Sequence, residues 1–176
     1  MNSSAWERHL ITTILAHPEL QTWCGHLDVR LPELREIQKV AGFKSSDEVL
    51  EIGCGNGLGS AFFSKIVRSI VASDLPAVDH SAHAIGLEKT RRLFELAEVD
   101  NGRIEGCSAQ QLPFPDASFD AVLSLCVLEH MPDKLACLQE CRRVLRPGGR
   151  LIAAVPAAGW SLFYTLGFYH DFALRL

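Results

Sequence analysis

Short apolar segments alternate with helix-patterned segments over the middle of this 176-residue chain, and this alternation constrains its fold more than any other feature. The expected strands are residues 48–52, 69–73, 103–105, 119–125 and 150–155. The expected helices between them are residues 60–67, 88–97 and 134–145. Because strands that alternate with helices form right-handed βαβ units, the pattern predicts an α/β fold with a mostly parallel sheet and helices on both faces.

The segments on either side of this pattern have a different composition. Three parts are therefore expected, namely a helical segment at 1–45, the sheet-forming core at 46–156 and an aromatic-rich tail at 157–176. In the first part, Trp6, Leu10 and Ile14 recur at helical spacing, and Pro32 is expected to open a second helix.

A glycine-rich loop, E-I-G-C-G-N-G at residues 51–57, follows the first expected strand. Open α/β sheets bind ligands at the carboxyl ends of their strands, and glycines let the backbone approach a ligand closely. The nicotinamide fingerprint G-x-G-x-x-G requires a glycine where Leu58 or Ser60 stands. A ligand is therefore expected at this loop, but the loop lacks the spacing typical of a nicotinamide enzyme.

Four motifs carry a resemblance to a known family. Residues 51–57 resemble E-x-G-x-G-x-G, the first motif of class I S-adenosylmethionine (SAM)-dependent methyltransferases. Residues 111–120 resemble the LPF-x-D-x-S-F-D signature of the methyltransferase-11 domain, and residues 127–130 and 143–149 resemble its L-E-H and R-V-L-K-P-G-G segments. The resemblance implies a Rossmann-like methyltransferase fold and methyl transfer from SAM to a small-molecule acceptor.

The resemblance also implies a set of cofactor-binding residues at the strand ends. They are Glu51, Gly53, Cys54, Gly55, Asn56, Gly57, Asp74, Leu75, Ser108, Ala109, Gln110 and Leu125. Glu51 is expected to hold the loop and the cofactor's amino group, and Asp74 to accept hydrogen bonds from a ribose. Ser108 stands where the family usually has an aspartate, so it is expected to be a weaker, neutral acceptor for the adenine.

His130 is the expected catalytic residue, since it follows the fourth strand and an imidazole titrates near neutral pH. The alternative is a histidine that only braces the next helix. No metal site is expected: Cys137 and Cys141 lack a second His or Cys pair, and His80 and His83 are interpreted as surface residues.

The chain after Val155 is too short for the helix and two strands that the family adds. The sheet is therefore expected to lack its last two strands, and the tail at 157–176 to be truncated and irregular or helical. Its apolar surface is expected to be covered by a missing C-terminal segment first of all, or else by a second copy of the chain or an apolar substrate. A non-catalytic SAM-binding or scaffolding domain and a nicotinamide-dependent oxidoreductase are the alternative functions. Nothing in the sequence identifies the acceptor.

Charge and cysteine content limit which partners and which compartment are expected. The net charge of −4 and the absence of a Lys/Arg cluster argue against a nucleic acid. The uncharged stretch from Leu151 to Tyr169 is interrupted by Pro156 and Gly159, which argues against a membrane span. Its first part, Leu151 to Val155, predicts a buried strand. Scattered cysteines and the lack of a secretory pattern favour a cytoplasmic protein. The expected partners are an apolar small-molecule acceptor and a second copy, bound through the tail or an uncovered sheet edge.

Overall fold

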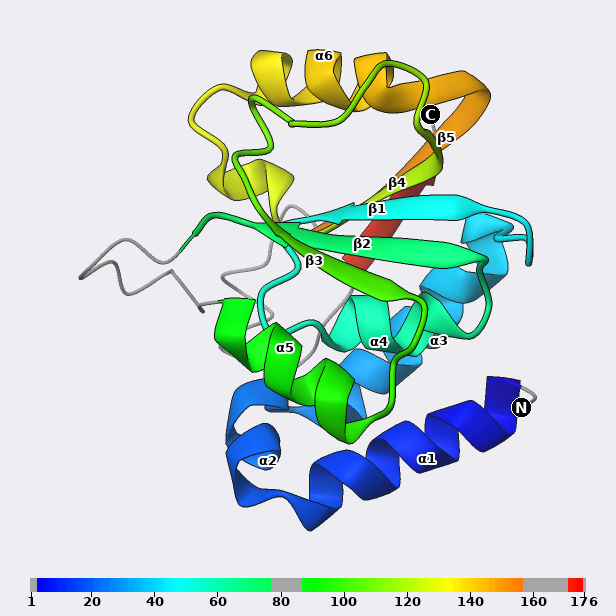
Figure 1. Cartoon of the computed structure of the whole chain (residues 1–176), viewed down its shortest axis with the longest axis vertical. Coiled ribbons are helices and arrows are strands. Elements are labelled where there is room, and N and C mark those ends of the chain that lie inside the picture. Colours follow the sequence, from blue (N-terminus) through cyan, green and yellow to red (C-terminus); the bar gives the residue numbers. More distant parts are fainter. Residues whose placement is uncertain (1–2, 77–86, 157–170, 176) are drawn as a thin grey trace.

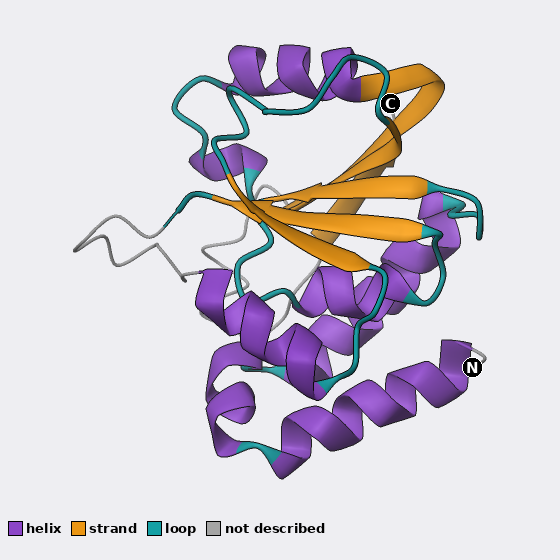
Figure 2. Cartoon of the chain, in the orientation of Figure 1, coloured by secondary structure: helices purple, strands orange, loops and turns teal. Residues whose placement is uncertain are grey.

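The computed structural model describes residues 3–76, 87–156 and 171–175, which form a six-stranded sheet with helices on both faces (Figures 1 and 2). The strand order is β3-β2-β1-β4-β5-β6; the first five strands are parallel and β6 is antiparallel to β5. The strands are β1 (Glu48–Ile52), β2 (Ser69–Asp74), β3 (Gly102–Gly106), β4 (Phe119–Leu125), β5 (Leu145–Pro156) and β6 (Asp171–Arg175). The expected Rossmann-like α/β fold is confirmed.

Helices divide unequally between the two faces of the sheet. One face carries the first five helices, and the other carries α6, which packs on β5 (Figure 1). The helices are α1 (Ser3–Ala16), α2 (Pro18–Cys24), α3 (Leu27–Ala41), α4 (Leu58–Ser64), α5 (Leu87–Leu96), the 3-10 helix η1 (Leu128–His130) and α6 (Lys134–Val144).

The central strands are buried on both faces, which explains their nearly continuous apolar sequence. Val49 and Leu123 belong to the larger core on the α4 side, whereas Leu50 and Val122 belong to a second core under α6. Successive side chains of a strand point to opposite faces. Each strand therefore contributes to both cores and separates the two helical layers.

The strand order places a switch point beside β1. The chain proceeds outward on one side through β2 and β3, and on the other side through β4 and β5. The crossovers that leave β1 and β4 thus diverge, and such a divergence opens a crevice at the carboxyl ends of the two strands. The glycine-rich loop begins at this point, directly after Ile52.

One expectation for the N-terminal helices was wrong, and one helix was not predicted. Pro32 does not open a helix; it lies inside α3, which begins five residues earlier at Leu27. Packing outweighs the proline's local cost, because Leu34 and Ile37 from the same helix are buried in the core. The short helix α2 was not predicted, although Pro18 at its first position is a recognised start signal.

The expectation of an irregular or helical tail was wrong for residues 171–175, which form β6 along β5. An antiparallel neighbour satisfies the edge backbone groups of β5 without a helical crossover. The outer edge of β5 is therefore covered, and the uncovered edge expected there for self-association is not present. The rest of the expected aromatic surface, residues 157–170, lies outside the described residues.

Candidate functional site

The loop after β1 is shaped by three glycines with left-handed backbone conformations: φ is +66° at Gly53, +57° at Gly55 and +81° at Gly57. A Cβ on Gly53 would overlap Val127, and a Cβ on Gly57 would crowd Thr90. A Cβ on Gly55, in contrast, would meet no atom within 4 Å. Gly53 and Gly57 are thus needed for packing, whereas the space over Gly55 is open to a ligand.

Asp74 ties together the ends of three strands. Its Oδ2 accepts a hydrogen bond from the Gly55 backbone N–H at 2.7 Å, and its Oδ1 accepts one from the Leu75 N–H at 2.7 Å. Its carbonyl oxygen accepts from the N–H of Cys107, the residue after β3, at 2.9 Å. Each carboxylate oxygen has two lone pairs, so Asp74 can fix the glycine loop and still accept from a ligand hydroxyl.

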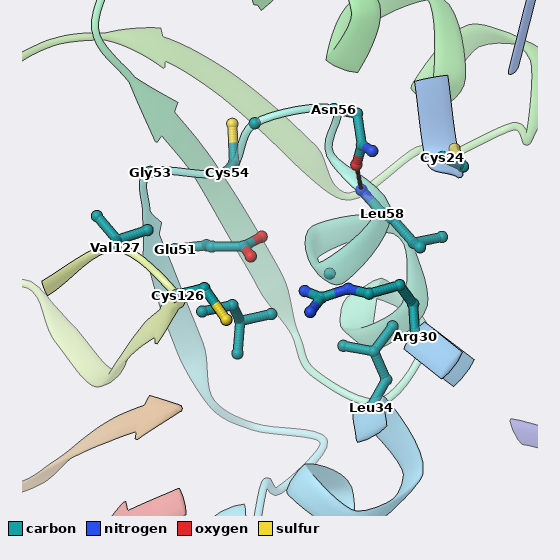
Figure 3. A pocket seen from close by; sticks show the side chains of 13 residues that line it. Cys24, Arg30, Leu34, Glu51, Gly53, Cys54, Asn56, Leu58, Cys126 and Val127 are labelled. Atoms are coloured by element: carbon teal, nitrogen blue, oxygen red, sulfur yellow. Dashed lines mark hydrogen bonds between the residues drawn. The ribbon is translucent and has the colours of Figure 1, made fainter. Parts of the chain in front are cut away.

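A cavity of about 320 Å³ opens beside this loop (Figure 3). It is lined by the strand ends of β1 and β4 together with residues of α2, α3 and α4. The lining residues are Cys24, Arg30, Leu34, Glu51, Gly53, Cys54, Gly55, Asn56, Leu58, Gly59, Leu125, Cys126 and Val127. Six of the twelve residues implied as cofactor contacts therefore border one cavity: Glu51, Gly53, Cys54, Gly55, Asn56 and Leu125.

Glu51 is the buried acid of the cavity, with only 2% of its surface exposed. Burial raises its pKa to about 7, although a hydrogen bond from the Ser60 hydroxyl and the positive charge of Arg30 both act to lower it. Desolvation disfavours the carboxylate, whereas a cation or donor favours it. A cationic group brought into the cavity would therefore shift Glu51 toward its charged form.

Two of the three cysteines that line the cavity, Cys24 and Cys54, are not activated nucleophiles. Burial raises the pKa of Cys24 to about 11, and burial also raises the pKa of Cys54. Because the thiolate is the nucleophilic form, both side chains are inert near neutral pH. They serve as small, weakly polar wall residues.

Asn56 holds the loop against the N-terminal helices. Its side-chain oxygen accepts from the Leu58 N–H at 3.0 Å, and its amide nitrogen donates to the Trp23 carbonyl at 2.7 Å. Gly57 lies at the N-terminus of α4, where its N–H donates to the Cys54 carbonyl at 2.8 Å. These contacts make both residues part of the loop's framework.

The expected adenine-binding residues lie beyond Asp74, along the carboxyl ends of β2 and β3. Ser108 accepts a hydrogen bond at its hydroxyl from the Gln110 N–H at 3.2 Å, and Ala109 is buried. Leu75 is 54% exposed. They share the carboxyl edge of the sheet with the cavity but do not line it, so the structure brings them to the same side without joining them into one pocket.

The end of β4 is more exposed. Cys126 adopts a left-handed φ of +56° and donates its N–H to the Ala154 carbonyl at 2.8 Å. The side chain of His130 is 77% exposed, with its Nε2 at 4.0 Å from Glu129 Oε1. His130 is not among the residues that line the cavity, so its catalytic role stays a prediction.

The cavity residues that come from the N-terminal helices were not predicted from the sequence. They are Cys24 from α2, and Arg30 and Leu34 from α3. No motif marks them. The apolar face of α3 was a usable signal for Leu34, but the expectation that a helix starts at Pro32 left Arg30 outside any element.

Two further features concern metals and membranes. Within residues 3–76, 87–156 and 171–175, no three His, Cys, Asp or Glu side chains gather in a way that could hold a metal ion. In the same part of the chain, no helix has the length and apolarity needed to cross a membrane. His80 and His83 lie outside the described residues.

Comparison with known proteins identifies the family. The profile of the methyltransferase domain family matches residues 50–153. The chain is 38% identical over 121 residues to 27-O-demethylrifamycin SV methyltransferase of Amycolatopsis mediterranei, an alignment that covers 66% of this chain and 42% of the relative. It is 32% identical over 119 residues to a Mycolicibacterium smegmatis protein named "Probable S-adenosylmethionine-dependent methyltransferase", covering 68% of this chain and 42% of the relative.

A solved structure agrees with these matches. The YcgJ protein of Bacillus subtilis superposes with a TM-score of 0.64 at 29% identity, covering 71% of this chain and 50% of that one. The chain thus spans less than half the length of the two relatives. These comparisons support neither a nicotinamide-dependent oxidoreductase nor a scaffolding domain. The match over residues 50–153, more than half of the chain, shows that the protein belongs to the methyltransferase domain family.

Proposed function

We propose that this chain binds SAM at the carboxyl ends of β1 to β4 and transfers its methyl group to a small-molecule acceptor. The observation that carries the proposal is the cavity beside the glycine loop, where open space over Gly55 meets a buried acid, Glu51, next to the strand-end acid Asp74. These residues fit the cofactor. A backbone without a side chain admits close approach, Glu51 suits an ammonium, and Asp74 suits a ribose diol.

The chain's residues have distinct roles in holding the cofactor. Asp74 accepts hydrogen bonds from ribose hydroxyls, while its bond to the Gly55 N–H keeps the loop in place. Ser108 and the backbone of Ala109 and Gln110 contact the adenine, and Leu75 covers its face. Leu75 is 54% exposed, which supports this role, because packing against the ring would remove its apolar surface from water.

SAM supplies a methyl group that is already activated by a positively charged sulfur. The protein then has to align acceptor and methyl and exclude water. Leu34, Leu125 and Val127 give the cavity apolar walls that serve this exclusion. His130 is exposed on η1, which follows the end of β4 that lines the cavity. We propose that it contacts the acceptor and accepts a proton from acceptors that must lose one.

The acceptor is proposed to be a small, largely apolar molecule. The name of the Amycolatopsis relative gives 27-O-demethylrifamycin SV as its acceptor, which supports a small molecule rather than a macromolecule. The charge of the chain supports it too, because a net charge of −4 does not favour a nucleic acid. A nucleic-acid acceptor would instead require a basic surface.

The test has two stages. Mass spectrometry of the purified chain under native conditions should detect bound SAM or its demethylated product, and an acceptor screen with methyl-labelled SAM should then give a labelled small molecule. Binding without turnover across a broad acceptor panel would favour a non-catalytic SAM-binding domain. Absence of SAM binding at concentrations up to about 1 mM would contradict the proposal, because cofactor sites of this kind have dissociation constants below about 1 mM.

A further inference from the structure

The sheet has an edge strand that pairs on one side only. Strand β3 is the outermost strand at the end of the sheet opposite to β6, and among the described residues it pairs with β2 alone (Figure 1). A strand in this position presents a row of backbone donors and acceptors with which another strand can pair. Strand β5 has such a partner in β6, whereas β3 has no second partner in the part of the chain that the structure describes.

The hydrogen bonds between β2 and β3 show which backbone groups of β3 point outward. The Asn101 carbonyl accepts a hydrogen bond from β2 at 3.1 Å, and the Cys107 N–H donates one to β2 at 2.9 Å. Every second residue of a parallel strand bonds to the same neighbour. The N–H and C=O groups of Gly102, Ile104 and Gly106 therefore point away from the sheet.

Strand β3 also carries two charged side chains that have no ion pair within the described residues. Arg103 is exposed, and its guanidinium lies 5.6 Å from the centre of the Phe114 ring. Glu105 is half-buried and lies on the same face of the sheet as Arg103, because side chains two residues apart in a strand share a face. The strand thus presents a positive and a negative charge, one on each side of Ile104.

The helix beside this edge has charges that are already paired. A groove of about 400 Å³ lies between α5 and β3, and Arg91, Phe94 and Glu95 line it from the helix. Arg91 is 2.6 Å from Glu88, and Glu95 is 3.8 Å from Arg92. These four charges compensate one another within α5. Among the described residues, the charges at this edge that lack a counter-charge are therefore those of β3.

An identical strand complements this edge. When two copies of β3 lie antiparallel about a two-fold axis at Ile104, Arg103 of each copy is directly opposite Glu105 of the other. Gly102 is then opposite Gly106 of the other copy, and the outward N–H and C=O groups of both strands pair with one another. Opposite charges on directly opposed residues stabilise an antiparallel pair, and like charges destabilise it. A parallel, in-register pair would instead oppose like charges.

We propose that the chain forms a symmetric dimer through β3, in which two sheets join into one continuous sheet and Arg103 of each copy pairs with Glu105 of the other. The partner at this edge is thus a second copy of the chain. The cavity beside the glycine loop lies at the ends of β1 and β4, and β2 separates β1 from β3. The dimer therefore leaves the cavity open and goes beyond the function proposed above.

Charged residues on a short edge strand have a rival interpretation, because such charges also keep other sheets from pairing. In that case the chain is a monomer, and reversing a charge on β3 changes nothing in its association. In the dimer, reversing one charge places like charges opposite each other, and the two-fold axis repeats the clash. Reversing both charges restores the match.

The experiment measures self-association of the full 176-residue chain by sedimentation equilibrium in the wild type, Arg103→Glu, Glu105→Arg and the double variant with both changes. The wild type should dimerise with a dissociation constant of roughly 1–100 µM, as expected for a small interface. Each single reversal should weaken dimerisation about 10-fold or more. The double variant should dimerise about as tightly as the wild type. An equimolar mixture of the two single variants should also dimerise, because each charge then faces its opposite.

The matched control is Arg142→Glu. Arg142 is exposed on α6, which packs on β5, and its reversal changes the net charge as Arg103→Glu does. It should leave the dissociation constant of the dimer unchanged. Thermal unfolding shows whether each variant is folded. Arg103→Gln and Glu105→Gln, which remove one charge without reversing it, carry the test if a reversal variant is unfolded, and each should weaken the dimer less than the reversal does.

Three results would overturn the proposal. The first is a wild type that stays monomeric at roughly 500 µM, well above the expected dissociation constant. The second is a dimer that the single reversals do not weaken, because its interface then lies elsewhere. The third is a loss in the single variants that neither the double variant nor the mixture restores, because the two charges then do not face each other.

Discussion

The ends of β1 and β4 both border the cavity, but the candidate functional side chains at or after them are held in different ways. At β1, Glu51 is 2% exposed and accepts a hydrogen bond from Ser60, and the loop that follows is tied to Asp74. At β4, His130 is 77% exposed, with Glu129 at 4.0 Å as its charged neighbour. Under the proposed function, the first end is a pre-formed half of the site that would hold the cofactor, and the second is an open half that would face the acceptor.

The largest effects are expected within the pre-formed half, where two glycines of one loop should behave differently. Gly53→Ala combines a left-handed φ with overlap onto Val127, so we expect a loss of about 2–5 kcal/mol of unfolding free energy. Gly55→Ala carries only the backbone strain, about 1–2 kcal/mol, but obstructs the open space.

Urea unfolding measures the loss of unfolding free energy in the two alanine variants, and SAM titration measures the effect on binding. Gly55→Val should abolish SAM binding in a folded protein, because a branched side chain fills more of the same space. Equal destabilisation by Gly53→Ala and Gly55→Ala would contradict the packing role of Gly53. Wild-type affinity in Gly55→Val would remove Gly55 from the ligand path.

The second effect concerns the protonation of Glu51. Its pKa is about 7 in the folded protein against a usual value of 4.5, so the folded state binds this proton more tightly than the unfolded chain. The contribution to stability is therefore fully present below about pH 4.5 and is lost as the pH rises to about 7. We expect about 1–3 kcal/mol over this window.

Glu51→Gln isolates this contribution, because the amide keeps the shape of the side chain and does not titrate. The difference in unfolding free energy between wild type and variant should change in favour of the variant from pH 4.5 to pH 7.5. A pH-independent difference would show that Glu51 is ionised throughout and that burial does not control it.

The third effect concerns Asp74, which holds the glycine loop through the Gly55 N–H and is proposed to bind the ribose. Asp74→Ala should weaken SAM binding by about 1–3 kcal/mol, the range for hydrogen bonds to a charged acceptor. Part of the loss should come from the loop, since the Gly55 N–H loses its partner. Calorimetry that gives unchanged affinity would exclude Asp74 from the site.

The smallest effect on the fold and on SAM affinity is expected in the open half. His130→Ala should change the unfolding free energy by less than about 0.5 kcal/mol, because its side chain is 77% exposed. SAM affinity should stay the same, while turnover with an acceptor that must lose a proton should fall about 100-fold. Unchanged turnover would leave His130 with only a surface role.

The sheet could be predicted from sequence because its signals are local. Strand β4 begins and ends at the expected residues, and β1 and β2 do so to within one residue, since apolar runs bounded by turns mark buried parallel strands. Strand β5 begins at Leu145, five residues earlier than expected, because Leu145 pairs with Phe119 before the register shifts. The glycine loop was likewise predicted from its own spacing.

The rest depends on tertiary packing, which a motif does not encode. Arg30 faces the cavity only because α3 continues through Pro32 and packs with Leu34 against the core. Strand β6 forms because β5 offers an edge, not because residues 171–175 have a strong strand pattern. The half of the site that motifs describe was predictable, and the half supplied by the N-terminal helices was not.

Cofactor binding at the carboxyl ends of β1 to β4 is tested most directly by a crystal structure of the chain with S-adenosylhomocysteine, the demethylated cofactor. We expect the ribose hydroxyls on Asp74, the amino-acid end in the cavity beside Glu51, and backbone contact at Gly55. A ligand bound elsewhere would contradict it, for example in the groove that Leu138, Arg142 and Leu151 line beside α6.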